Sequence, residues 1–180
     1  MKFHLYYRGN LKSNGSAREK QRLRISLHPQ LSALWEREPL LDHTISLDGK
    51  KEELTKQAVL ETVGKWTFCP VITPLLRLRC ELDILILMPG KATGAFAGGD
   101  IDNRLKTLLD ALRCPQNKNE VRDVSEPPSP LCCLMKDDSL IDAIRIECDT
   151  LLDAQNESEL LFLVQVNAVK TAVTWGNVAL

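Results

Sequence analysis

The residues best suited to chemistry lie between Gly98 and Arg113, in the stretch GGDIDNRLKTLLDALR. Apolar residues recur there at steps of four, three and four, at Ile101, Leu105, Leu108 and Leu112. This spacing predicts a short helix that docks one face onto a core. The other face carries charged side chains at i, i+4, i+8 and i+11, namely Asp102, Lys106, Asp110 and Arg113.

Two carboxylates stand at the start of this helix. Asp100 lies two residues before Asp102, and they can converge where the chain changes from extended to helical. Converging carboxylate oxygens suit a hard divalent cation such as Mg²⁺. A plainer interpretation is also open: Asp is a favoured residue in the first turn of a helix, and Asp102 with Lys106 has the spacing of an ordinary surface ion pair.

A further pair of carboxylates, Asp137 and Asp138, precedes a strand pattern in KDDSLIDAIRIECD. Together with the helix, this arrangement resembles the RusA-type Holliday-junction resolvases. Their signature is D-x-D-N-x-x-K-x-x-x-D-A-L followed by a D-D pair that leads into a strand. The match covers residues 100–112 and 137–141 closely and the flanking strands only by pattern. The segment between helix and D-D pair is longer here than in the family.

The resemblance implies a metal-dependent endodeoxyribonuclease that cleaves branched DNA in recombination and repair. It assigns Asp100, Asp102 and Asp138 to a divalent metal, Mg²⁺ or in its place Mn²⁺, and gives Lys106 a part in phosphodiester cleavage. Asn103, Asp110 and Asp137 belong to the motif without a defined role. A four-way junction has two-fold symmetry, so paired nicks favour a homodimer with one site per subunit.

Two other functions remain open at this stage. One is a non-catalytic nucleic-acid-binding or regulatory protein on the same scaffold. The other is a related metal-dependent nuclease that acts on flaps, forks or RNA.

The distribution of charge favours a phosphate-binding surface near the N-terminus. The net charge of the chain is −1, yet residues 1–30 contain seven lysines and arginines against one glutamate. Such a cluster is suited to a nucleic-acid backbone, although a solvated face with no partner has the same composition. The predicted nucleic-acid-binding residues are Arg8, Lys12, Arg18, Lys20, Arg22 and Arg24.

The remaining composition is that of an ordinary globular protein, with 44% hydrophobic and 26% charged residues. MKFHLYYRG has no apolar signal-peptide core, and no apolar run approaches the roughly 20 residues of a membrane span. Six cysteines without a C-x-x-C pair are typical of reduced thiols, so we expect a cytoplasmic protein without a membrane partner.

Alternation of apolar and polar residues predicts strands at 2–8, 21–29, 76–88, 140–149 and 159–169. Helical spacing predicts a short helix at 28–38 and a longer one at 49–66, besides the one at 98–113. We expect a basic loop at 9–21 and an irregular, Pro-rich insertion at 114–136. The predicted fold is α+β: a single RusA-like domain over residues 1–180, with a mixed β-sheet and two main helices.

Overall fold

A four-stranded sheet, called here the large sheet, organises the molecule. The computed structural model describes residues 1–40, 59–89, 100–121 and 128–173. The strand order of the large sheet is β1-β7-β4-β6, with β4 and β6 parallel and the other neighbours antiparallel. Its strands are β1 (Lys2–Asn10), β4 (Leu78–Met88), β6 (Ile141–Thr150) and β7 (Glu159–Lys170).

A second sheet, called here the small sheet, has three strands in the order β2-β3-β5. β2 and β3 are antiparallel, whereas β3 and β5 are parallel. These strands are β2 (Glu61–Val63), β3 (Trp66–Ile72) and β5 (Leu131–Met135). In the described part of the chain, the α-helices are α1 (Ala17–Trp35) and α4 (Asp100–Leu112), and single 3-10 turns form η1 (Pro74–Leu76), η3 (Lys118–Glu120) and η4 (Asp138–Leu140).

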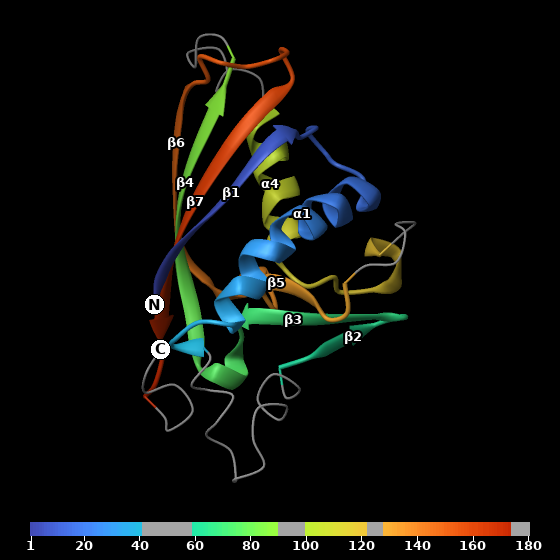
Figure 1. The fold of residues 1–180 in the computed structure, drawn as a ribbon, viewed down its shortest axis with the longest axis vertical. Helices are drawn as coiled ribbons and strands as arrows, with labels where there is room; N and C mark the ends of the chain where they lie inside the picture. Colours follow the sequence, from blue (N-terminus) through green and yellow to red (C-terminus); the bar gives the residue numbers. More distant parts are fainter. Residues whose placement is uncertain (41–58, 90–99, 122–127, 174–180) are drawn as a thin grey trace.

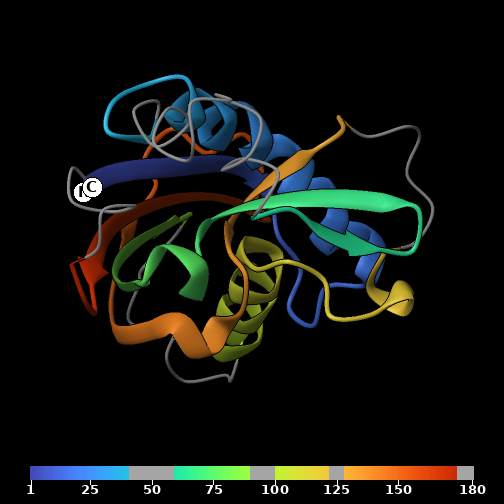
Figure 2. The same ribbon diagram turned by 90° about the horizontal axis from the view of Figure 1, so that it is seen from below.

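Both α-helices and the small sheet lie on one side of the large sheet (Figure 1 and Figure 2). α1 contacts β1, β5 and α4, so it joins the two sheets into one structure. The other side of the large sheet, called here the open face, carries exposed side chains such as His4 and Tyr6. The α+β class, the single domain and the mixed sheet are therefore confirmed.

The interior of the large sheet follows the sequence pattern closely. Leu82, Ile84 and Ile86 of β4 are buried in the core, and Leu85 on the opposite face is half-buried. A strand that is apolar on both faces belongs in the middle of a sheet, and β4 lies between β7 and β6. The strands predicted at 2–8, 140–149 and 159–169 are confirmed as β1, β6 and β7.

The strand predicted at 21–29 is wrong, because these residues belong to α1. The helix begins with a capping box: Ser16 Oγ accepts the Glu19 N–H at 3.3 Å, and Glu19 Oε2 accepts the Ser16 N–H at 2.8 Å. Pro29 does not end the helix, which continues through the predicted 28–38 segment as far as Trp35. The strand that pairs with β1 is β7.

Three predicted boundaries also change. The basic loop is shorter than 9–21, because β1 extends to Asn10 and α1 starts at Ala17. Of the helix predicted at 49–66, residues 49–58 lie outside the described residues, while Glu61–Val63 and Trp66 form a hairpin around Gly64. The insertion at 114–136 is not irregular throughout, since it contains η3 and the fully buried strand β5.

None of the described helices is both long enough and apolar enough to cross a membrane. Of the two main helices predicted, α4 is confirmed, and residues 49–58 of the other lie outside the described residues.

Candidate functional site

The exposed side of α4 carries the central residues of the sequence motif. The apolar stripe predicted for this helix is confirmed, because Ile101, Leu108 and Leu112 are buried and Leu105 is partly so. Asp102 and Lys106 are exposed on the other side. Within the described residues no ion pair joins them to each other or to a third group.

Asp100 is the first residue of α4. It stands two residues before Asp102 in the chain, as the predicted pair of carboxylates requires. Its side chain lies outside the described part of the structure. The N-terminal turn of α4 thus keeps a carboxylate and, one turn later, an ammonium group open to solvent. This turn is called here the acidic turn, and it comprises residues 100–106.

Asp138 does not lie at the acidic turn. Its Oδ2 is 4.0 Å from Nε of Arg113, the residue that follows the C-terminal end of α4. The Arg113 guanidinium also contacts Asp110 Oδ1 at 3.2 Å, so Asp138 lies beside the last turn of the helix. At 1.5 Å per residue, Asp102 and Asp110 are about 12 Å apart along the axis.

The oxygen ligands of Mg²⁺ lie about 2.0–2.1 Å from the metal, so in this arrangement Asp138, beside the last turn of α4, does not converge with Asp102 in the first turn. The described residues contain no group of three or more His, Cys, Asp or Glu side chains arranged to hold a metal. The structure therefore separates the downstream carboxylate that the resemblance assigns to the metal from the acidic turn.

The other carboxylates of the motif have structural partners. Asp110 accepts Lys20 Nζ at 2.6 Å and Arg113 Nη2 at 3.2 Å. Burial acts to raise the pKa of Asp110, but the hydrogen bond and charge of Lys20, helped by Arg113, outweigh it and leave the pKa lowered. The backbone carbonyl of Asn103 accepts the hydroxyl of Thr107 at 2.9 Å.

Asp137 caps η4 rather than facing the acidic turn. Its Oδ1 accepts the Ser139 N–H at 3.0 Å, and its Oδ2 accepts Gln116 Nε2 at 2.7 Å. The hydrogen bonds from Ser139 lower the pKa of Asp137, with smaller contributions from Arg113 and Gln116. Because these bonds are made to the ionised form, Asp137 stabilises the turn into β6 as a carboxylate.

Three of the six predicted nucleic-acid-binding residues have partners within the protein. Arg24 is only 1% exposed and donates to the carbonyls of Asp110 and Arg113 at the end of α4. Burial lowers the pKa of Arg24. Arg8 bonds Asp153 and Glu159, each at 2.9 Å, and Lys20 is held by Asp110. The prediction is wrong for Arg24, which DNA cannot reach.

The remaining three basic side chains, Lys12, Arg18 and Arg22, are exposed. Lys12 is 78% exposed and pairs with Glu19 at 3.4 Å on the surface. Residues 11–18, called here the basic segment, cover the loop before α1 and the first residues of that helix. Two of the three, Lys12 and Arg18, belong to this segment.

The basic segment lies directly against α4. Arg104 Nη1 donates to the Leu11 carbonyl at 2.7 Å, and the Gly15 N–H donates to Thr107 Oγ1 at 2.9 Å. Gly15 is buried so close to the helix that an added Cβ would meet Thr107 Cγ2 at 2.5 Å. The sequence gives no sign of these contacts beyond a glycine in a turn, yet they hold the backbone of the basic segment against Arg104 and Thr107 of α4.

No family model, no curated protein and no solved structure matches this chain. The residues of α4 and the basic segment are therefore the features that bear on function.

Proposed function

We propose that the protein is a metal-dependent endonuclease of the RusA-like kind, which binds branched DNA over the acidic turn and cleaves one phosphodiester there. The observation that supports it most is the packing of the basic segment against α4. This contact holds the segment with the exposed Lys12 and Arg18 against the helix with the exposed Asp102 and Lys106, and cations of this kind suit a phosphate backbone.

The carboxylate oxygens of the acidic turn are the kind of ligand that a hard divalent cation prefers. Mg²⁺ is usually held by one or two carboxylates together with waters and substrate phosphate, so Asp100 and Asp102 are sufficient as its protein ligands. When bound, Mg²⁺ or Mn²⁺ supplies positive charge to the scissile phosphate and acidifies a water molecule. Asp138 is left out of this ligand set because of its distance from Asp102.

The side chains of this chain have separate tasks in the proposal. Asp102 holds the cation, and Lys106 places a fixed positive charge near the phosphate oxygens as negative charge builds on them. Lys12 and Arg18 bind flanking phosphates and position the strand. Two copies of the chain would cut a symmetric junction at two positions.

All six cysteines are free thiols, and five of them are buried. Thiols that stay reduced are typical of the cytoplasm, and we place the protein there.

A second function, binding to nucleic acid without cleavage, is favoured by one specific observation. Asp138 is held beside Arg113, at the far end of α4 from Asp102. A protein that only binds would need the basic segment but not the acidic turn.

The test is incubation of the purified protein with labelled four-way junction, fork, linear duplex and RNA, in Mg²⁺ and in EDTA. We expect Mg²⁺-dependent nicks in the junction, and fork or RNA cleavage instead would redirect the proposal to a related nuclease. Asp102→Asn removes a charge with almost no change in volume, so it should bind the junction and fail to cut it. Junction binding by wild type without nicks in Mg²⁺ or Mn²⁺ would establish the binding function.

A further inference from the structure

A hollow on the open face of the large sheet gathers polar and charged side chains on the side of the sheet away from α4. Its volume is about 270 Å³, and residues of all four strands line it. One side of the hollow is a row of four residues, each the register partner of the next, and it is called here the polar row. The polar row consists of His4 on β1, Gln165 on β7, Asp83 on β4 and Arg145 on β6.

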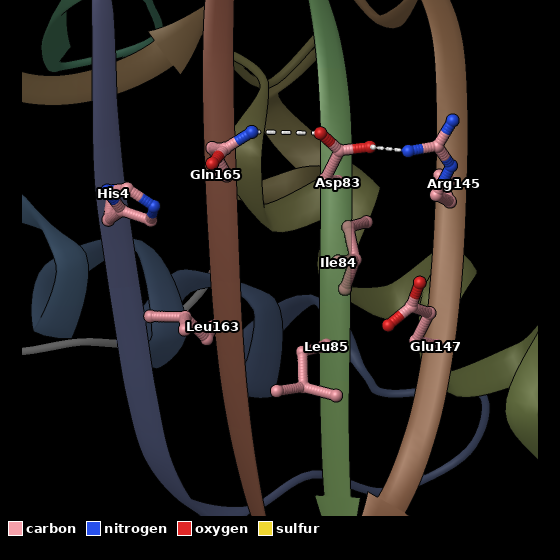
Figure 3. A pocket seen from close by; sticks show the side chains of 8 residues that line it. All are labelled: His4, Asp83, Ile84, Leu85, Arg145, Glu147, Leu163 and Gln165. Atoms are coloured by element: carbon pink, nitrogen blue, oxygen red, sulfur yellow. Dashed lines mark hydrogen bonds and ion pairs between the residues drawn. The ribbon is translucent and has the colours of Figure 1, made fainter.

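The hydrogen bond within the polar row decides which of its atoms accept. A carboxylate has no donor of its own, so Gln165 turns its amide nitrogen towards Asp83, and Nε2 donates to Oδ2 at 2.9 Å. Gln165 Oε1 is then an acceptor beside the carboxylate. Figure 3 shows this order along the row, with Asp83 between Gln165 and Arg145.

The Arg145 guanidinium is the donor of the polar row. Its Nη1 lies 3.8 Å from Asp83 Oδ1, which is too long for a hydrogen bond. Among the described residues the five N–H donors of this guanidinium have no other acceptor. The order along the row from Gln165 to Arg145 is therefore acceptor, acceptor, donor.

Guanine presents the complementary order along one edge: the 2-amino donor, the N1–H donor and the O6 acceptor, with the N7 acceptor next to O6. Arginine donating to O6 and N7 is a common contact to this base. Adenine and cytosine offer one amino donor followed by an acceptor, so they engage Asp83 and Arg145 and leave Gln165 Oε1 without a donor. Uracil has an acceptor on each side of its N–H, and one of them would face Gln165 Oε1.

The rest of the hollow suits a base better than a phosphate. Leu163, which is 39% exposed, and the half-buried Leu85 form an apolar side against which a flat ring can lie (Figure 3). Asp83 and Glu147 give the hollow two carboxylates against the single guanidinium of Arg145, a balance that repels phosphate. The volume is below the range of pockets for drug-sized ligands, as expected for one ring system.

We propose that this hollow binds a guanine base, with Gln165 Oε1 and Asp83 accepting the 2-amino and N1 hydrogens and Arg145 donating to O6. A free guanine nucleotide and an unpaired guanine in a nucleic-acid strand present the same edge. The inference goes beyond the nuclease proposal and uses neither α4 nor a metal, so either can fail without the other.

The experiment is isothermal titration of the wild type with the 5′-monophosphates of guanosine, inosine, adenosine, cytidine and uridine, in EDTA. We expect a Kd below about 1 mM for the guanosine nucleotide. The inosine nucleotide lacks only the 2-amino group and should bind about fivefold more weakly, for one lost hydrogen bond. The other three should bind at least about tenfold more weakly.

Two oligonucleotides identify the source of the base: one of thymine alone and one of thymine with a single central guanine. Preference for the second over the first supports the base site, and an affinity above that of the guanosine nucleotide assigns it to a strand. Tighter binding of the nucleotide than of either oligonucleotide supports the site as one for free nucleotide.

Asp83→Asn and Arg145→Met should each weaken binding of the guanosine nucleotide at least about tenfold. Asp149→Asn is the matched control, because Asp149 is exposed on β6 outside the hollow and the change removes the same charge as Asp83→Asn. It should bind like the wild type, and thermal melts report whether each variant is folded. A Kd above roughly 5 mM for the guanosine nucleotide, equal affinity for all five nucleotides, or undiminished binding by folded Asp83→Asn and Arg145→Met overturns the proposal.

Discussion

Lys106 and Lys20 both lie next to α4, and the structure predicts opposite consequences for replacing them with methionine. Lys106 is exposed and forms no ion pair within the described residues. Lys20 is 23% exposed, and its Nζ lies 2.6 Å from Oδ2 of Asp110, which is 14% exposed. Methionine retains an apolar chain of similar length and removes only the charge.

The expected magnitudes follow from these surroundings. Lys106→Met should change the free energy of unfolding by less than about 0.5 kcal/mol, the range of an exposed helix charge. Lys20→Met leaves a mostly buried carboxylate with one cation fewer, a loss of about 1.5–3 kcal/mol for a hydrogen bond to a charged group. At about 2–4 °C per kcal/mol for a domain of this size, the Lys20 variant should melt several degrees lower.

The assay is single-turnover cleavage of a labelled four-way junction at saturating protein and Mg²⁺, together with a thermal melt. Lys106→Met should retain the wild-type melting temperature and lose a factor of about 100 or more in rate, as for removal of a group that stabilises developing charge. Lys20→Met should cut at nearly the wild-type rate below its melting temperature. A folded Lys106→Met protein that cuts normally would refute the role given to this lysine.

Three further predictions concern packing, acid stability and binding. Gly15→Ala should destabilise the fold by about 1–3 kcal/mol in denaturant unfolding, because the new Cβ would meet Thr107 Cγ2. Adding Thr107→Ser, which removes that methyl group and keeps the hydroxyl, should restore most of the stability. Because the pKa of Asp110 is lowered in the folded state, its carboxylate stabilises the fold above the usual carboxyl pKa of about 4, and this stabilisation is lost as pH falls through the folded-state pKa. In urea unfolding, Asp110→Asn should be less stable than the wild type at pH 7, and the difference in the free energy of unfolding between the two should shrink as the pH is lowered to about 3. The double variant Lys12→Ala, Arg18→Ala should bind the junction more weakly. The slope of the logarithm of its binding constant against the logarithm of salt concentration should fall by about one unit for each phosphate that is no longer neutralised. An unchanged slope would place the DNA elsewhere.

The sequence predicts α4 and the large sheet well because their periodicity is strong. The apolar stripe of α4 fits the helical period and not that of a strand, and the alternation in β1, β6 and β7 fits the period of a strand and not that of a helix. The end of α1 lies in the helix predicted at 28–38. Residues 21–29 have the pattern of a strand because Leu23, Ile25 and Leu27 also alternate, although Leu23, Leu27 and Leu31 have helical spacing and Ser16 with Glu19 is a capping-box signal. β5 was missed because five apolar residues after several prolines are too short to show a period.

The side-chain roles were harder to predict because tertiary contacts decide them. Arg24 has the sequence context of a surface cation in a basic run, yet the last carbonyls of α4 need donors, and the packing of α1 on α4 places its guanidinium there. Nothing in the sequence shows that neighbouring Lys20 has a carboxylate partner 90 residues away. Such pairings depend on which faces of two helices meet.

Asp138 provides the sharpest contrast between the motif and the geometry. The resemblance places Asp138 with Asp102 on one metal, whereas the parallel bridge between Arg113 and Met135 delivers the D-D pair to the C-terminal end of α4. The Asp138 side chain is 53% exposed, and its 4.0 Å contact with Arg113 is worth about 0–1 kcal/mol at such a surface site.

Asp138→Asn should therefore leave both the melting temperature and the junction-cleavage rate close to those of the wild type, while Asp102→Asn abolishes cleavage. Both variants remove one negative charge and keep the side-chain volume, so each controls for the other. Measured Mg²⁺ dependence of the Asp138→Asn rate gives a second readout, because removal of a metal ligand would raise the Mg²⁺ concentration needed for half-maximal cleavage. Equal loss of activity in the two variants would show that Asp138 joins Asp102 on the metal when DNA is bound, and that the path from α4 to β6 changes on binding.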